Sequence, residues 1–263
     1  MAEEIDRYRA PALDKGLDIL EVLAAAEDSL SQAEICRALG RSPNEIYRML
    51  DRLVRRNYVR RTPEDRYALT LKLFELAHAR EPLKRLINQA LPLMRQFAMT
   101  SEQACHIVVY DRNALVVVAQ VDSPSYWNVS LRVGSRMDLV NTGSGHVFLA
   151  YAEPGERALM LAKRDSVSES DVPADFDARL DRVRKQGFEN MESAQVVAVS
   201  NLSAPIFGPL GSVIAVMTCP YAARLDRPDA PSPDQTLELL LETARTLSAN
   251  LSASPTSPRK DSE

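Results

Sequence analysis

The chain has 263 residues, of which 45% are hydrophobic and 26% charged, a balance typical of a soluble globular protein long enough for two domains. Its net charge of −4 and pI near 5.6 argue against a protein that attracts nucleic acid over its whole surface. No apolar run approaches the ~20 residues that a membrane helix needs, and the acidic beginning MAEEIDRY has the pattern of neither a signal peptide nor a transit peptide. We therefore expect a cytoplasmic protein with no membrane partner.

Three cysteines and three histidines are the candidates for a disulfide or a metal site: Cys36, Cys105, Cys219, His78, His106 and His146. The cysteines are odd in number, widely separated and include no CxxC pair, so we expect buried apolar thiols. The histidine spacings match no standard zinc pattern, and Cys105 and His106 would point to opposite faces of a strand. The sequence thus predicts no metal site and no cofactor.

Two short helices joined by a tight connection are predicted within Leu30–Leu69. Ser31 can cap the first helix, with Glu34 three residues later as in a capping box, and Gly40 can end it in the left-handed conformation. Ser42-Pro43 then provides a new cap followed by proline at the first helical position. This order of signals is typical of a helix-turn-helix.

The second of these helices is amphipathic and precedes a predicted hairpin. Its apolar residues recur at the i, i+3, i+4, i+7 spacing: Ile46, Met49, Leu50 and Leu53. Asn57 tolerates left-handed backbone, and the stretches 58–61 and 66–69 then alternate around a turn at 62–65. Such a hairpin is the wing of a winged helix-turn-helix.

Basic charge is concentrated in this segment. Between Arg37 and Arg66 there are nine arginines and four acids, a local balance of +5, so the remaining residues carry about −9. A solvated surface would explain the charge alone, but the caps, the helix spacing and the hairpin together favour double-stranded DNA as the partner. The candidate DNA contacts are Ser42, Asn44, Glu45, Tyr47, Arg48, Arg52, Arg60, Arg61 and Arg66.

The rest of the chain contains further helices and a sheet. An amphipathic helix entered through Pro11 would pack behind the helix pair, a connecting helix is predicted over 71–79, and Pro82 fits the start of another helix that Pro92 should kink. Strands are predicted at 105–111, 114–122, 127–133, 196–199, 202–207 and 212–219. Helices are predicted at 146–152, 154–164, 173–186 and 233–251, and residues 253–263 are expected to form a disordered tail.

Several stretches together resemble the IclR family of bacterial transcription regulators: LDKGLDILEVL, NEIYRMLDRLVRRNYV, RYALTLKLFEL, RVGSRMDLVNTGSGHVFLA, KQGFENMES and NLSAPIFGPLGSVIAVMT. The resemblance implies an α+β protein with an N-terminal winged helix-turn-helix (10–70), a linker helix (71–81) and a C-terminal GAF-like antiparallel-sheet domain (82–252) that binds an effector. It also implies a homodimer or homotetramer on a pseudo-palindromic operator. A small organic acid would then control a catabolic operon.

The effector site is predicted around the small-residue stretch Gly143-Ser144-Gly145. From the residues alone, this stretch is either a tight turn or a set of backbone amides that binds a carboxylate before a helix, and the resemblance favours binding. His146 follows, at a position where a lysine or arginine is common in the family. The predicted effector contacts are Gly143, Ser144, Gly145, Asn201, Thr218, Met191, Tyr126, Trp127 and Met137. Trp127 fits a core role equally well.

Two other classes of function remain open. An enzyme would use Ser144 as a nucleophile, but Thr142 and His146 occupy the positions of the two glycines in G-x-S-x-G. The chain contains neither a GxxxxGK phosphate loop nor GxGxxG, so we expect no catalytic activity. The second alternative is a winged helix that binds protein, with the C-terminal domain acting as a dimer scaffold.

Overall fold

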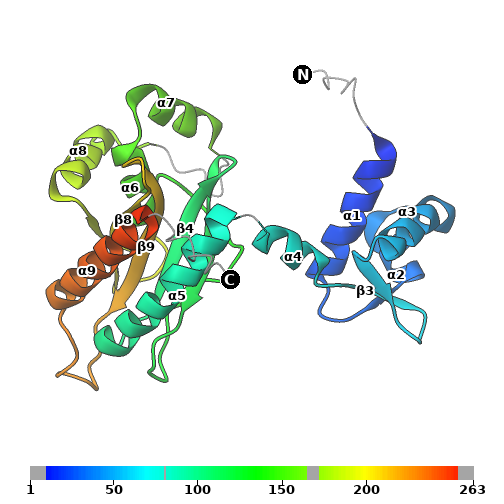
Figure 1. Cartoon of the computed structure of the whole chain (residues 1–263), viewed down its shortest axis with the longest axis horizontal. Helices are drawn as coiled ribbons and strands as arrows, with labels where there is room; N and C mark the ends of the chain where they lie inside the picture. Colours follow the sequence, from blue (N-terminus) through cyan, green and yellow to red (C-terminus); the bar gives the residue numbers. More distant parts are fainter. Residues whose placement is uncertain (1–9, 80, 165–171, 254–263) are drawn as a thin grey trace, which may run out of the picture. The chain divides into compact units, whose positions relative to one another are not determined.

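The computed structural model describes residues 10–79, 81–164 and 172–253, and the chain divides into two compact units between Lys84 and Arg85 (Figure 1). Apart from Ala253, the tail expected to be disordered lies outside the described residues.

The first unit combines three helices with a small antiparallel sheet. The helices are α1 (Pro11–Ala25), α2 (Gln32–Leu39) and α3 (Pro43–Arg55), and the strands are β1 (Leu30–Ser31), β2 (Val59–Arg61) and β3 (Arg66–Leu69). The strand order is β1-β3-β2, so the predicted hairpin of β2 and β3 forms, and β1 adds a short strand that the sequence analysis did not anticipate. The linker helix α4 (Lys72–His78) follows.

Local signals in the sequence account for these boundaries. The Glu34 carboxylate accepts hydrogen bonds from both the amide and the hydroxyl of Ser31, which completes the predicted capping box. Gly40 and Asn57 both have a φ of 60°, the left-handed conformation expected of them. Apolar side chains from all three helices and from β2 and β3 then form one core: Ile19, Leu23, Ile35, Cys36, Ile46, Leu50, Val59 and Tyr67.

The second unit is an antiparallel sheet with helices on both faces. Its strands are β4 (Cys105–Asp111), β5 (Ala114–Val121), β6 (Arg136–Met137), β7 (Glu189–Glu192), β8 (Val199–Phe207) and β9 (Val213–Ala222), in the order β6-β5-β4-β9-β8-β7. Its helices are α5 (Glu81–Ser101), α6 (Gly143–Tyr151), α7 (Pro154–Lys163), α8 (Phe176–Gln186) and α9 (Pro233–Ser252). The α+β class expected from the sequence is confirmed.

Figure 1 shows α5 and α9 side by side on one face of this sheet, while α6 and α8 lie on the other face. Arg85 on α5 donates to the carbonyls of Asn250 and Ala253, which ties the two helices together. α5 continues through Pro92. At the β4–β5 turn, Arg112 and Asn113 both have positive φ, which suits a two-residue hairpin.

The strand predicted at 127–133 is wrong. Residues 127–133 form no strand, and β6 at Arg136–Met137 pairs with β5 instead. The alternating apolar pattern is present, but Trp127 is 67% exposed and Val133 62% exposed, so it does not mark a buried face. Side chains compete for the backbone just before it: Asn128 accepts from the Ser123 amide, and Ser125 accepts from the Trp127 amide.

The strand predicted at 196–199 is wrong except at Val199, which begins β8, and β7 at Glu189–Glu192 was missed. Residues 193–198 form a loop in which the Ser193 hydroxyl accepts from the amides of Gln195 and Val196. Ala198 adopts a φ of 62° there. β7 was missed because its sequence, ENME, has little of the apolar or β-branched character that marks a strand.

Candidate functional site

The helix α3 presents most of the predicted DNA contacts on its exposed side. Ile46 and Leu50 are fully buried, whereas Asn44, Tyr47, Arg48 and Arg52 are exposed. The polar and cationic side chains therefore lie on the face away from the core, where they can reach bases and phosphates.

The two predicted contacts at the beginning of α3 are engaged in capping. The Glu45 carboxylate accepts from the amide and the hydroxyl of Ser42, and Lys15 of α1 donates to it at 3.1 Å. The amide hydrogen bond from Ser42 is the main cause that lowers the pKa of Glu45 to about 2. Glu45 therefore stays ionised and holds the first turn of α3.

The wing arginines differ in how firmly they are held. Arg60 and Arg61 are exposed, and Arg61 pairs with Asp65 while its guanidinium lies 5.9 Å from the centre of the Tyr67 ring. Arg66 instead donates to the Ser29 carbonyl at 2.6 Å and to Glu34 at 2.9 Å. Its guanidinium thus fastens the hairpin to the capped end of α2, a structural role that its position in the sequence did not indicate.

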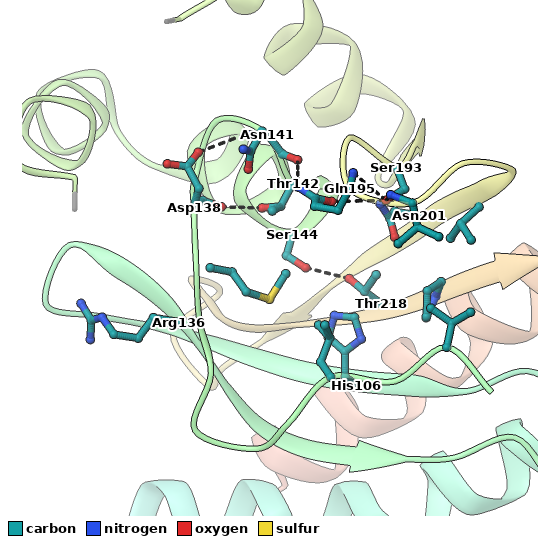
Figure 2. Close-up of a pocket in the computed structure, with 17 residues that line it drawn as sticks. His106, Arg136, Asp138, Asn141, Thr142, Ser144, Ser193, Gln195, Asn201 and Thr218 are labelled. Carbon is teal, nitrogen blue, oxygen red and sulfur yellow. Dashed lines mark hydrogen bonds between the residues drawn. The ribbon is translucent and has the colours of Figure 1, made fainter. Parts of the chain in front are cut away.

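A cavity of about 300 Å³ lies in the second unit between the beginning of α6 and the sheet (Figure 2). Its apolar wall consists of Val129, Leu131, Met137, Val196, Val199 and Pro220. Its polar lining includes His106, Asn141, Thr142, Ser144, Asn201 and Thr218. A mainly apolar cavity with a few polar groups at one end is typical of a small-molecule site.

Three hydroxyls form a chain at the polar end. The Ser144 Oγ lies 2.8 Å from the Thr218 Oγ1, which in turn lies 2.8 Å from the Ser203 Oγ. The chain contains three hydroxyl protons but only two hydrogen bonds, so one hydroxyl retains a proton to donate. Ser144 and Thr218 both line the cavity, so either of them can donate that proton to a molecule there.

His106 lies beside this chain. In the sheet it is the register partner of Thr218, and Figure 2 shows its ring next to that residue. The side chain is 2% exposed, and neither ring nitrogen has a hydrogen-bond partner among the described residues. Burial lowers the pKa of His106 to about 4, so the ring is neutral at neutral pH. Because an unpaired buried polar group costs about 1–3 kcal/mol, a partner for this ring would be stabilising.

The stretch Gly143-Ser144-Gly145 is the first turn of α6 rather than a loop. Thr142 caps the helix, and its hydroxyl oxygen accepts from the Gly145 amide at 3.1 Å. A Cβ atom on Gly145 would lie 2.1 Å from the Leu139 carbonyl oxygen, so this glycine permits close backbone packing. The Gly145 amide is thus already paired, whereas the first two helical amides, those of Gly143 and Ser144, have no partner within the helix.

Asp138 organises the turn before α6. One of its carboxylate oxygens accepts from the Val140 amide at 2.6 Å and from the Asn141 amide at 3.1 Å, and its carbonyl accepts from the Thr142 hydroxyl. Figure 2 shows the carboxylate pointing away from Ser144 and Thr218. Arg136 also lines the cavity, but its guanidinium donates to the Arg112 carbonyl.

The structure brings together some of the predicted effector contacts and separates others. Those that line the cavity are Gly143, Ser144, Met137, Asn201 and Thr218. Gly145 and Met191 do not line it, and Tyr126 and Trp127 border a neighbouring depression of about 370 Å³. Tyr126 there donates to Asp226 and packs against Arg224, whose guanidinium lies 5.4 Å from its ring centre.

Several cavity residues were not identified from the sequence: His106, Arg136, Asp138, Asn141, Thr142, Ser193 and Gln195. For His106 a signal did exist, because a histidine beside the apolar run IVV stands out on a strand. The sequence correctly placed Cys105 and His106 on opposite faces: Cys105 contacts the Met94 carbonyl of α5, and His106 faces the cavity.

His146 forms a buried pair instead of lining the cavity. Its Nδ1 lies 2.6 Å from a Glu189 carboxylate oxygen, its Nε2 lies 2.7 Å from the Val140 carbonyl, and the side chain is fully buried. The Val140 carbonyl can only accept, so Nε2 carries a proton. His146 thus joins the first turns of α6 to β7.

The cysteines and histidines do not form a metal site within the described part of the chain, where no three metal-binding side chains cluster. Cys36, Cys105 and Cys219 are free and buried, as expected. Burial raises the pKa of Cys105 to about 12, so this thiol stays protonated. Among the described helices, none is long and apolar enough to span a membrane.

Two family profiles cover most of the chain. Residues 12–63 match the family described as "IclR helix-turn-helix domain", and residues 83–249 match "Bacterial transcriptional regulator IclR C-terminal". The chain belongs to the IclR family of bacterial transcription regulators. It is therefore a DNA-binding transcriptional regulator, and the enzyme alternative is set aside because the matching families and relatives are regulators.

Curated relatives of this IclR-family chain are similar over most of its length. The HTH-type transcriptional regulator KdgR of Dickeya chrysanthemi is 28% identical over 212 residues, which cover 79% of this chain and 69% of the relative. The HTH-type transcriptional repressor AllR of Klebsiella pneumoniae is 24% identical over 257 residues, covering 94% of this chain and 92% of the relative.

Solved structures share the IclR-family fold. An IclR homologue of Microbacterium hydrocarbonoxydans complexed with 4-hydroxybenzoate aligns with a TM-score of 0.75 and 22% identity, covering 92% of this chain and all of that chain. HmgR of Pseudomonas aeruginosa aligns with a TM-score of 0.73 and 23% identity, covering 93% of this chain and 100% of that chain. At these identities the likeness concerns the fold.

Proposed function

We propose that this regulator binds a pseudo-palindromic operator as a homodimer and controls a catabolic operon in response to a small organic acid held in the cavity. The observation that carries the proposal is the cavity itself, where the amino end of α6 and the Ser144 hydroxyl meet an apolar wall. Amides at a helix N-terminus favour an anion, and the apolar wall suits a hydrocarbon portion.

Two further observations support an acid as the effector. The relative from Microbacterium hydrocarbonoxydans was solved with 4-hydroxybenzoate, a small aromatic acid. The size of the cavity, about 300 Å³, is that of a site for a small molecule.

The homodimer is supported by apolar side chains around α4. Leu71 is 73% exposed, Leu73 is 40% exposed and Leu76 is 49% exposed, all on or beside a helix of seven residues. Such side chains on so short a helix favour burial against a second copy of the chain.

A screen of small carboxylates on the purified protein tests the effector. An acid that binds only the folded protein raises the melting temperature by mass action. It should also change the affinity for DNA upstream of the regulator's own gene or its neighbours, measured by electrophoretic mobility shift. Ser144→Trp should fill the cavity and abolish both responses while DNA binding persists. An unchanged response in this variant would contradict the location of the site.

Paired arginine variants test the DNA surface. Arg48→Ala on α3 should relax sequence preference, since an arginine–guanine contact contributes about 1–3 kcal/mol of discrimination. Arg60→Ala in the wing should lower the affinity for all DNA sequences by the same factor. It should also reduce the slope of log K against log salt by about 0.9. Titrations over a salt series, on operator and random duplexes, separate the two effects. Equal losses of affinity for random DNA in both variants would contradict the assignment of Arg48 to a base and of Arg60 to a phosphate.

A further inference from the structure

We propose that His106 is a specificity-determining residue that selects acids carrying a hydroxyl group, by forming a hydrogen bond with that hydroxyl. This inference rests on the proposed function, because it assumes that an organic acid occupies the cavity. It adds the chemical class of the acid and a residue that sequence reasoning did not place in the site.

His106 belongs to a row of polar side chains that crosses the sheet. Neighbouring strands place their polar side chains in register: Gln120 on β5, His106 on β4, Thr218 on β9, Ser203 on β8 and Glu189 on β7. In-register side chains of adjacent strands lie on the same face, here the face covered by α6. His106 is thus one strand away from the hydroxyl chain that ends at Ser144.

The other residues of this polar row have hydrogen-bonding partners. Thr218 and Ser203 bond to one another, Glu189 bonds to His146, and the Gln120 amide donates to the Val121 carbonyl and to Asp122. His106 alone of the row has no partner among the described residues, although it is 2% exposed and lines the cavity. A molecule in the cavity is therefore in a position to satisfy it.

The protonation state of the His106 ring determines which hydrogen bonds it can form. Because it is neutral at neutral pH, one nitrogen donates a hydrogen bond and the other accepts one. A hydroxyl suits whichever of the two nitrogens faces it, since it can donate to the unprotonated nitrogen or accept from the protonated one. A carboxylate only accepts, and it has a better position at the amino end of α6, where the amides and the Ser144 hydroxyl donate.

The acid therefore spans two neighbouring elements. Its carboxylate lies at the first turn of α6, and its hydroxyl lies about one strand spacing, roughly 4.8 Å, farther along the sheet at His106. The apolar wall, which includes Val129 and Leu131, contacts the carbon skeleton between them. Hydroxybenzoates, and aliphatic acids whose hydroxyl is on the β carbon or beyond, have this combination of groups.

Matched pairs of acids test the inference by calorimetry: 3- and 4-hydroxybenzoate against benzoate, and 3-hydroxybutyrate against butyrate. At least one hydroxylated acid should bind the parent protein roughly tenfold to a hundredfold more tightly than its partner, because that partner leaves a buried imidazole unpaired. His106→Phe should reduce this ratio to near one. His106→Gln, which retains a donor and an acceptor, should restore part of it. Met99→Leu, a change at an exposed position of α5 that does not line the cavity, should leave the ratio unchanged.

An independent readout uses the parent protein alone. The chain has three histidines, so selective ¹⁵N labelling of histidine gives few side-chain signals. Addition of the preferred hydroxylated acid should shift the ring nitrogens of His106 and leave those of His146, which are held by Glu189 and Val140, in place. This measurement also decides the matter if the His106 variants do not fold.

The outcomes separate this inference from the function on which it rests. A preference for hydroxylated acids that persists in His106→Phe, or a His106 signal that stays unchanged on binding, overturns the role of His106. Equal binding within every matched pair does the same, while the proposed effector class survives. Failure of every carboxylate to raise the melting temperature of the parent overturns both.

Discussion

His106 combines nearly complete burial with a lowered pKa, and this combination makes folding stability depend on pH. Its pKa is about 4 in the folded protein, against an ordinary histidine value of 6.5, so the unfolded chain binds more protons between these limits. Stability contributed by the neutral ring is therefore complete above pH 6.5 and is lost as the pH falls towards 4.

Replacing this histidine tests that linkage. From pH 7 to pH 5 the parent should lose about 2 kcal/mol more unfolding free energy than His106→Gln, which does not titrate. Urea denaturation at both pH values, without added acid, gives the comparison. Parallel pH profiles for the two proteins would mean that the imidazole is not held neutral in the fold.

Single residues were predictable from the sequence where their role is local. Ser31, Glu34, Gly40 and Asn57 act on backbone groups a few positions away, and the structure shows each in the expected conformation or bond. The hydrogen bonds of Arg66 and the place of His106 in the cavity were not predicted, because their partners lie far along the chain. Arg66 pairs with Glu34, 32 positions away, and His106 faces a cavity assembled from several strands.

At the level of elements, α6 depends on a backbone contact that only glycine permits. The Gly145 Cα lies so close to Leu139 that an added Cβ would meet its carbonyl oxygen at 2.1 Å. Gly145→Ala should therefore destabilise the second unit by about 1–3 kcal/mol, the usual cost of overpacking, and weaken acid binding by shifting the first turn of α6. Thermal denaturation and calorimetry measure the two effects.

Gly155 provides the matched control. It lies in the first turn of α7, and nothing lies within 4 Å of where its Cβ would be. Gly155→Ala should be neutral or stabilise by up to about 1 kcal/mol, because alanine restricts the unfolded chain. If both variants behaved alike, close packing of α6 on Leu139 would not be what constrains Gly145.

Helices were predictable and the two misplaced strands were not, for a physical reason. Helix ends carry their own chemical signals, such as Ser232 at the beginning of α9, whose oxygen accepts from the Gln235 amide. A strand is defined by its partners. The stretches at 127–133 and 196–199 are apolar enough, but serine and asparagine side chains bind the nearby backbone and compete with strand pairing.

At the level of the whole molecule, the cavity and its polar row belong entirely to the second unit. All residues of the core cluster that includes α6, from Val108 on β4 to Val216 on β9, come from this unit. A fragment from Glu81, where α5 begins, to Ala253 should therefore fold alone and bind the same acid with the parent's affinity. Circular dichroism and calorimetry on the fragment check this. An unfolded fragment, or a folded one without affinity, would place part of the site outside it.

The chain of three hydroxyls has a consequence for how an acid is sensed. Among the described residues neither end meets a further acceptor, so its hydrogen bonds can run from Ser203 to Ser144 or in the reverse direction. An acid at Ser144 accepts a proton and selects one direction, so Thr218 and Ser203 must both donate towards it. A contact made at one atom on α6 thereby fixes the polarity of hydrogen bonds on β9 and β8.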